Sequence, residues 1–272
     1  MKISFIGGGN MATALIAGLV GKVPQPGDIH VVDLNPEALN KLHTQYGVST
    51  ASSIGDAVAA SSVIVLAVKP QQMREVAAQL QSQLTGRPLL LSIAAGIRSA
   101  DLARWLDGYG AIVRAMPNTP ALIKKGITGL VAMADVSEEQ KELADDVMRA
   151  VGDTLWLNDE SQIDAVTAVS GSGPAYVFYF LEAMQQAASE MGLAPEEGKQ
   201  LALATFMGAA RLAAQSDEEL EVLRQRVTSK GGTTHAAITS MEAAGVKEAI
   251  VAAMKAAQAR GRELGDELGQ PR

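Results

Sequence analysis

The sequence of 272 residues contains no cysteine, and this absence excludes disulfides, thiolate zinc sites and cysteine nucleophiles. Aromatic side chains are also scarce, at 4% of the residues, so Ala, Val, Leu, Ile and Met must fill the core. Basic residues are outnumbered, because 23 Lys and Arg against 30 Asp and Glu leave a net charge of -7. Such a chain offers no basic field to nucleic acid, and we expect no nucleic-acid partner.

Long apolar runs are missing as well. No run reaches the roughly 18 residues of a membrane span, and Met1 to Ile6 shows no basic-then-apolar leader. The histidines, His30, His43 and His235, show neither the spacing of metal ligands nor that of a catalytic triad, so no metal is expected. We therefore expect a cytoplasmic protein that does not act at a membrane.

In the first half of the chain, short apolar runs alternate with helical patterns. Predicted strands lie at 2–6, 29–33, 63–68, 89–93 and 111–115, with a further short run at 130–133. Predicted helices lie at 11–20, 36–46 and 137–151, the last two with Asn35 and Ser137 as N-caps. Continuous apolar strands that alternate with helices are typical of a doubly wound parallel sheet covered on both faces. We expect this α/β domain to span residues 1–160.

After about residue 162, valine-rich strands give way to long stretches rich in Ala and Met. The pattern predicts helices at 174–191, 195–215, 218–227 and 235–241, with one or two more within 243–267. We expect residues 161–272 to form an all-helical domain. Because this domain is so apolar, we also expect a partner subunit to complete it.

A glycine-rich turn joins the first predicted strand to the first predicted helix. It fits the pattern G-x-G-x-x-G/A with the residues Gly7-Gly8-Gly9-Asn10-Met11-Ala12. Gly7 permits the tight turn, Gly9 lets the backbone approach a pyrophosphate, and Ala12 keeps the helix close to the strand. Free N–H groups and the helix dipole favour phosphates at this end of the helix. The strand and helix around the motif therefore favour a dinucleotide site, for NADPH or NADH, in a Rossmann-type domain.

Asp33 closes the second predicted strand, about 24 residues after Gly9. An acidic side chain at this point accepts hydrogen bonds from the adenosine ribose of NAD and repels the additional phosphate of NADP. An aspartate just before Asn35 and Pro36 can equally cap a turn. The sequence leaves both interpretations open, and with them the choice between NADH and NADPH.

Further polar and small residues follow later strands at the edge of the sheet where doubly wound folds bind ligands. The segments Ala67-Val68-Lys69-Pro70 and Ala94-Ala95-Gly96 each end a strand, and their small residues allow a ribose and a nicotinamide to lie against the backbone. Lys69 is either a charge partner for a ligand oxygen or a solvated loop lysine. In the proline-bounded loop 114–120, Asn118 either contacts the substrate or caps the turn, and its position favours the substrate.

Two segments of the second half combine glycines with hydroxyl residues. Residues 170–174, Ser-Gly-Ser-Gly-Pro, are expected to cap the long helix that follows, with lining of a site as the alternative. Residues 229–234, Ser-Lys-Gly-Gly-Thr-Thr, precede the helix at 235–241. Their Gly-Gly N–H groups can form an anion-binding nest, and their threonine hydroxyls can bond a ligand or cap the helix.

Taken together, these segments resemble the Δ1-pyrroline-5-carboxylate reductase family over nearly the whole chain. The segments that carry the resemblance are 5–11, 67–70, 94–96, 115–120, 170–176 and 231–234. The resemblance implies reduction of the cyclic imine pyrroline-5-carboxylate to L-proline, the last step of proline biosynthesis, by hydride from NADPH or NADH. It also implies a helical C-terminal domain that interleaves in a homodimer, or within a larger homo-oligomer.

The resemblance also implies roles for individual residues. The expected cofactor-binding residues are Ile6, Gly7, Gly8, Gly9, Asn10, Met11, Ala67, Val68, Lys69, Pro70, Ala94, Ala95 and Gly96, together with Asp33. Thr233 and Thr234 would meet the substrate. The chain departs from the family at Lys230, where many members have proline, and at Arg226, where some have an asparagine that reaches the cofactor. Asp33 replaces a small polar residue of some NADP-using relatives.

The chemistry of an imine agrees with this assignment, because an imine accepts hydride best when its nitrogen is protonated or hydrogen-bonded. Thr234 is the predicted catalytic residue, since its hydroxyl can supply that bond. The N–H groups of Gly232 and Thr233 would hold the substrate carboxylate at the helix start, and the main contribution of the enzyme would be to hold the nicotinamide against the imine carbon.

Two alternatives remain at this point. One is a 3-hydroxyacid dehydrogenase-like oxidoreductase, for which Lys199 lies in a suitable helix without a supporting motif. The other is a non-catalytic NAD(P)-binding sensor. The polar segment 231–234 argues against a sensor, because a sensor needs no second anion-binding nest.

Overall fold

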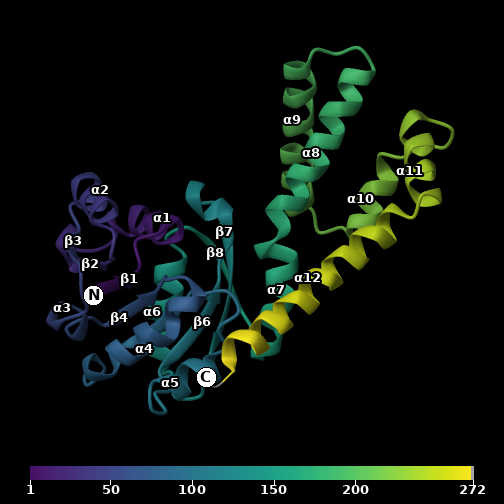
Figure 1. Cartoon of the computed structure of the whole chain (residues 1–272). Helices are drawn as coiled ribbons and strands as arrows, with labels where there is room; N and C mark the ends of the chain where they lie inside the picture. Colours follow the sequence, from purple (N-terminus) through teal and green to yellow (C-terminus); the bar gives the residue numbers. More distant parts are fainter. Residues whose placement is uncertain (271–272) are drawn as a thin grey trace. The chain divides into compact units, whose positions relative to one another are not determined.

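A computed structural model describes residues 1–270 (Figure 1). The chain divides into two compact units, and each is described by itself. An α/β unit comprises Met1–Ser172 and the end of the chain from Ala257 onward, and a helical unit comprises Gly173–Ala256. The boundary expected from composition, at 160/161, lies inside the α/β unit. The sequence pattern gives no sign that the end of the last helix belongs with the sheet, because α12 (Val246–Gly269) continues as one helix across the boundary between the units.

The α/β unit is built on a sheet of order β3-β2-β1-β4-β5-β6-β7-β8. Its strands are β1 (Ile3–Ile6), β2 (Ile29–Val32), β3 (Ser49–Ala51), β4 (Val63–Leu66), β5 (Leu89–Ser92), β6 (Ile112–Met116), β7 (Gly126–Ala132) and β8 (Gly152–Trp156). All neighbouring pairs from β3 to β6 are parallel. The doubly wound Rossmann-type fold predicted from the sequence is therefore confirmed.

Helices cover both faces of the sheet. They are α1 (Asn10–Leu19), α2 (Pro36–Tyr46), α3 (Asp56–Ala59), α4 (Met73–Leu80), α5 (Ser99–Trp105) and α6 (Glu138–Met148). Buried residues of α1, α2 and α6 share one core cluster with Val63 and Val65, whereas those of α3, α4 and α5 share another with Ile64 and Leu66. Because successive residues of a strand point to opposite faces, burial on both faces requires an uninterrupted apolar run.

The far end of the sheet departs from the sequence prediction. We expected a parallel sheet throughout, but β7 runs antiparallel to β6, with register Ala115 to Leu130. The 3₁₀ turn η4 (Thr119–Ile123) connects them, and a connection this short contains no crossover helix that could return the chain to a parallel start. Strands β3 and β8 were not predicted, because β3 has only three residues and neither strand contains a fully buried residue.

The two predicted N-caps are confirmed. Asn35 Oδ1 accepts hydrogen bonds from the N–H groups of Glu37 and Ala38, at 2.9 and 3.4 Å. Ser137 and Gln140 form a reciprocal capping box, with both bonds at 3.2 Å. Short turns complete the unit: η1 (Pro26–Asp28), η2 (Pro70–Gln72), η3 (Gln81–Gln83), η5 (Glu160–Gln162), α7 (Ile163–Val166) and the π turn η6 (Thr167–Gly171).

The helical unit contains α8 (Gly173–Glu190), α9 (Pro195–Ala214), α10 (Leu220–Arg226), α11 (Thr233–Ala243) and the first part of α12 (Val246–Gly269). The predicted all-helical character is confirmed. Helices α8 and α9 pack closely where Gly198 faces Ala188, since a Cβ at Gly198 would lie 2.8 Å from that methyl group. Among residues 1–270, no helix combines the length and hydrophobicity needed to cross a membrane.

Candidate functional site

The predicted ligand-binding segments of the α/β unit gather at one edge of the sheet. Because β1, β2, β4 and β5 are parallel, their carboxyl ends meet there. The glycine turn follows β1, Asp33 follows β2, and the segments beginning at Ala67 and Ala94 follow β4 and β5. Because β2, β1, β4 and β5 are neighbours in the sheet, these segments, which are far apart in the sequence, lie side by side along this edge, called the rim below.

Gly7 is required by the backbone geometry of this rim. Its φ of +102° lies in the region that favours glycine, and its N–H donates to the carbonyl of Val32 at 2.8 Å. A Cβ at Gly7 would lie 2.7 Å from the carbonyl oxygen of Ala67. Any side chain here would push β1 and the β4 segment apart, as the motif predicts.

Gly9 and the start of α1 form a cradle of the kind that a pyrophosphate needs. Gly9 is the N-cap of α1, and within residues 1–270 no side chain caps this helix. A Cβ at Gly9 would have no described atom within 4 Å, so its backbone faces open space. The first N–H groups of the helix and its dipole point into that space. The residues present therefore fit a dinucleotide phosphate.

Asp33 performs two tasks at the end of β2. Its Oδ2 accepts a hydrogen bond from the N–H of Gly8 at 2.6 Å, and its Oδ1 accepts one from the N–H of Asn35 at 2.8 Å. The second bond is the turn-capping role that the sequence suggested. The first fixes a carboxylate against the glycine turn. The two interpretations left open by the sequence are thus compatible.

The segments after β4 and β5 differ in exposure. Lys69 is exposed and precedes η2, whereas Ala94 is buried. The turn after β5 relies on Gly96, which has a φ of +75°. Such a left-handed turn places backbone, rather than side chains, at the rim.

The loop after β6 is held by hydrogen bonds between Asn118 and two neighbouring elements, η6 and β7. Asn118 Nδ2 donates to Ser170 Oγ at 3.1 Å, and Asn118 Oδ1 accepts from the N–H of Ile127 at 3.0 Å. Arg114, expected in this loop, instead lies in β6, where its buried guanidinium pairs with Glu160 at 2.8 Å. Sequence reasoning missed Glu160, which also accepts from the N–H and hydroxyl of Ser99, at 2.7 and 3.1 Å.

The expectation that residues 170–174 cap the long helix was wrong. Ser170 and Gly171 belong to the π turn η6, which follows α7 and leads through Ser172 into α8. With helical turns on both sides, there is no free helix start for a serine to cap. Ser170 instead accepts the bond from Asn118.

The second polar segment lies in the helical unit, at the start of α11. Gly232 is the N-cap, so Thr233 and Thr234 are the first two residues of the helix rather than caps, and both are exposed. Gly231 has a φ of +76°, and the N–H of Gly232 donates to the carbonyl of Ser229 at 3.0 Å. The Gly232 N–H is therefore engaged in the turn. The N–H groups of Thr233 and Thr234, at the positive end of the helix dipole, are the groups suited to an anion.

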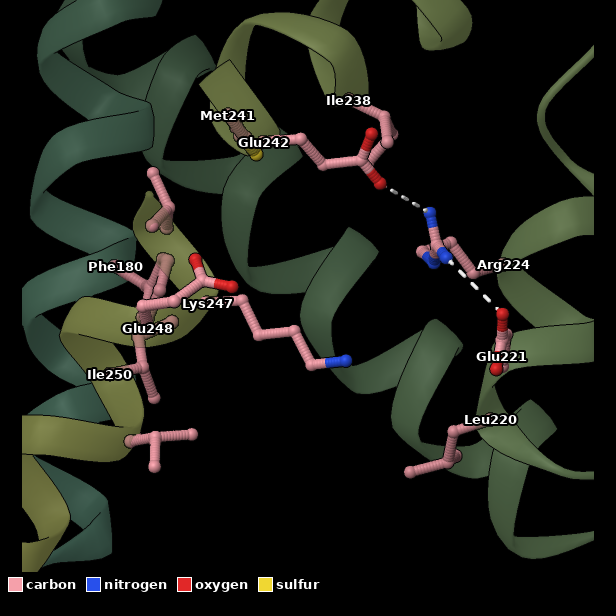
Figure 2. A pocket seen from close by; sticks show the side chains of 12 residues that line it. Phe180, Leu220, Glu221, Arg224, Ile238, Met241, Glu242, Lys247, Glu248 and Ile250 are labelled. Atoms are coloured by element: carbon pink, nitrogen blue, oxygen red, sulfur yellow. Dashed lines mark hydrogen bonds and ion pairs between the residues drawn. The ribbon is translucent and has the colours of Figure 1, made fainter. Parts of the chain in front are cut away.

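The helical unit also contains a hollow of about 720 Å³ that sequence reasoning missed. Its lining combines apolar residues, such as Leu220, Ile238 and Met241, with charged ones. Arg224 forms ion pairs with Glu242 at 3.3 Å and with Glu221 at 3.9 Å, and Figure 2 shows it between these two residues. Figure 2 also shows Lys247 extending into the open space. No sequence motif marks this hollow, because its lining comes from four helices.

Comparison with known proteins covers both units. Over 99% of the chain, the sequence is 46% identical to the pyrroline-5-carboxylate reductase of Pseudomonas aeruginosa, of which 98% is covered. The chain belongs to the pyrroline-5-carboxylate reductase family. A family model described as "Pyrroline-5-carboxylate reductase dimerisation" matches residues 160–264, and one described as "NADP oxidoreductase coenzyme F420-dependent" matches residues 2–96.

Solved structures of the pyrroline-5-carboxylate reductase family share the fold. The structure from Coxiella burnetii is 40% identical and has a TM-score of 0.91, with 97% of this chain and 98% of that chain covered. The Plasmodium falciparum enzyme, solved with NADP bound, is 27% identical and has a TM-score of 0.86, with 97% of this chain and 98% of that chain covered. The family resemblance identified in the sequence is confirmed, and membership implies an oxidoreductase that uses NAD(P)H and forms homo-oligomers.

Proposed function

We propose that this chain reduces Δ1-pyrroline-5-carboxylate to L-proline, the last step of proline biosynthesis, with NADPH or NADH as hydride donor. The observation that carries the proposal is that the likeness to pyrroline-5-carboxylate reductases covers 99% of the chain at 46% identity. It therefore includes both the glycine turn and the start of α11. It favours this reaction over that of a 3-hydroxyacid dehydrogenase-like protein and over a non-catalytic sensor.

We propose that the carboxyl edge of the sheet holds the cofactor, which supplies the hydride when bound. The free N–H groups of Gly9, Asn10 and Met11 hold the pyrophosphate, while Ile6, Gly7 and Gly8 shape the turn. Asp33 accepts from the adenosine ribose. The remaining predicted residues line the path of the second ribose and the nicotinamide: Ala67, Val68, Lys69, Pro70, Ala94, Ala95 and Gly96.

We propose that the start of α11 holds the substrate. The carboxylate accepts hydrogen bonds from the N–H groups of Thr233 and Thr234, in place of the Gly232 and Thr233 pair expected from the sequence. Gly232 keeps its role in shaping the turn. The Thr234 hydroxyl hydrogen-bonds the imine nitrogen and so favours hydride acceptance at the adjacent carbon. Asn118 fixes the loop after β6, and its contact with the substrate stays a prediction.

We further propose a homodimer as the basic assembly, with the helical unit as its dimerisation and substrate-binding part. The hollow beside Arg224 lies within the stretch matched by the dimerisation model, and its apolar lining suits the apolar helices of a second copy. The cytoplasmic location and the absence of nucleic-acid and membrane partners stay predictions.

The deciding experiment follows the oxidation of NADH and of NADPH with pyrroline-5-carboxylate, set against the reduction of NAD or NADP by a panel of 3-hydroxyacids. We expect turnover with the imine and formation of proline. Turnover with a hydroxyacid instead would support the dehydrogenase alternative. Cofactor binding without turnover of either substrate class would support a sensor.

A further inference from the structure

The end of α12 belongs to the α/β unit, although the 84 residues of the helical unit, Gly173–Ala256, precede it in the chain. Three glycines at intervals of four residues lie on one face of this end: Gly261, Gly265 and Gly269. A Cβ at Gly265 would lie 3.0 Å from the Arg98 guanidinium, and one at Gly261 would lie 3.5 Å from Asp164. A Cβ at Gly269 would overlap the carboxylate of Asp101. The glycines thus let the helix backbone approach the unit closely.

This approach places α12 directly against the turn after β5. A Cβ at Gly96 would lie 2.9 Å from Leu268 Cδ1 and 3.5 Å from Leu264 Cβ. Leu268 is also packed against the core cluster of α3, α4 and α5. Gly96 has no side chain that could pack and so hold its left-handed conformation. The side chain of Leu268, which lies against Gly96, restricts the turn instead.

Three arginines of the α/β unit tie down the helix end. Arg98 pairs with Asp266 at 2.7 Å and donates to the carbonyl of Arg262 at 3.3 Å. Arg104 donates to the carbonyl of Gly269, and Arg74 to that of Gln270, both at 2.6 Å. The last carbonyls of a helix lack partners within it and carry its negative dipole end, so cationic donors suit them well.

We propose that Leu268 and the Arg98–Asp266 pair are positioning residues for the nicotinamide half of the cofactor. They act through the Ala94–Gly96 turn. Leu268 packs against Gly96, and Arg98, which follows Gly96 by two residues, holds the turn to α12 through its ion pair with Asp266. The inference rests on the proposed function, because it takes this turn as part of the nicotinamide site. It assigns the C-terminal helix a part in the reaction that no motif in the sequence announces.

The test compares ligands that contain the nicotinamide with ligands that lack it. In the full-length protein, Leu268→Ala and Asp266→Asn are titrated with NADPH and with 2′-phospho-ADP-ribose, and with NADH and ADP-ribose. We expect both variants to bind the complete dinucleotides several-fold more weakly and the fragments as tightly as the unchanged protein does. We also expect kcat to fall by about tenfold, since small misplacement of a reacting group is costly. Leu268→Met keeps the volume of the side chain. We therefore expect this variant to retain most of the affinity for the dinucleotides and most of kcat.

Arg260→Ala is the matched control, because Arg260 lies on the same helix end but pairs with Glu263 and Glu267 of α12 itself. It should leave all four affinities and kcat unchanged. Equal weakening of dinucleotides and fragments, or no weakening of either, would overturn the inference. Should Leu268→Ala fail to fold, the comparison rests on Asp266→Asn and Leu268→Met. Because the affinities are measured without substrate, they decide the inference even if the unchanged protein does not reduce pyrroline-5-carboxylate.

Discussion

Asp33 places a negative charge beside the glycine turn, where its Oδ2 accepts the N–H of Gly8 at 2.6 Å. An additional phosphate on the adenosine ribose would meet this charge at close range. We therefore expect Asp33→Asn to raise the ratio of kcat/KM for NADPH to kcat/KM for NADH by roughly tenfold, which corresponds to about 1.4 kcal/mol. The ratio is measured with saturating pyrroline-5-carboxylate at low ionic strength.

Glu37→Gln is the matched control for this charge change, because Glu37 is an exposed acid in the first turn of α2. It should alter the ratio much less, since solvent and salt screen exposed charges. An unchanged ratio in Asp33→Asn would mean that the carboxylate serves the turn alone.

Thr234 is the proposed hydrogen-bonding partner of the imine nitrogen. Removal of its hydroxyl in Thr234→Ala should lower kcat/KM by about 10²-fold, the usual effect of losing a donor at a centre where charge changes. Cofactor affinity, measured by fluorescence titration, should stay near that of the unchanged protein. Thr234→Ser should retain most activity, and Thr239→Ala, an exposed change on the same helix, all of it. Full turnover by Thr234→Ala would remove this residue from the mechanism.

At the scale of single residues, the sequence predicts best where backbone geometry dictates the residue type. Gly7 is such a case, because its φ of +102° and the nearby Ala67 carbonyl leave no room for a side chain. Prediction fails where a polar group has several possible partners. Nothing in the sequence reveals that the Gly232 N–H is taken by Ser229, or that Asn118 bonds to Ser170 and Ile127.

Among the elements, those buried on both faces or provided with caps could be located from the sequence. Strand β4 and helix α2 show this, since the first is wholly buried and the second has Asn35 and Gly47 at its ends. Strand β8 escaped prediction because it is an edge strand whose residues are half-buried or exposed. The π turn before α8 escaped it because glycines and serines, which usually interrupt helices, there continue a helical path.

Asp145 connects helix α6 to strand β8. Its Oδ1 accepts from Thr154 Oγ1 at 2.6 Å and Trp156 Nε1 at 3.1 Å, and its carboxylate pairs with Arg149. Burial alone would raise the pKa of Asp145, but the hydrogen bonds from Thr154, Arg149 and Trp156 outweigh it and hold the pKa below its ordinary value of 3.8. A depressed pKa contributes stability that is present above pH 3.8 and is lost as the pH falls through the folded-state pKa.

We therefore expect Asp145→Asn to lower the unfolding temperature at neutral pH by roughly 2–4 °C, as for the loss of about 1 kcal/mol. The difference from the unchanged protein should narrow as the pH is lowered below 3.8, because the unchanged protein then loses the same charged acceptor. Thermal unfolding followed by circular dichroism over this range checks both points. Asp146→Asn, an exposed change on the same helix, should have the small effect of an ordinary surface substitution. A difference that stays constant with pH would contradict the argument.

At the scale of the whole molecule, the sequence indicated an α/β part and a helical part, but it did not indicate that the end of α12 belongs with the α/β unit. Helical periodicity continues without a break through α12, whose end from Ala257 onward belongs with the sheet. The glycines at 261, 265 and 269 are the one signal that could have revealed this, since their spacing creates a smooth face for close packing. Local patterns report how an element folds, but not which unit it packs against.

A single copy of the helical unit buries few of its own residues. Within residues 173–256, the only buried residues are three small ones, Ala188, Gly198 and Ala202. Large apolar side chains stay exposed instead, including Phe178 at 59% and Met207 at 58%. Exposed apolar surface on this scale marks a protein interface, in agreement with the homo-oligomers of the family.

We expect Phe178→Glu to disrupt this assembly, because the variant must bury a carboxylate at the interface without a partner. Light scattering at micromolar concentration should give a mass of at least twice 28.4 kDa for the unchanged protein and a lower mass, or aggregation, for the variant. Glu190→Gln, at the end of the same helix, should retain the assembly and its activity. An apolar dye should bind the dissociated variant more strongly than the control, since its apolar faces lose their cover. Retention of the full mass by Phe178→Glu would place the interface on another face of the helical unit.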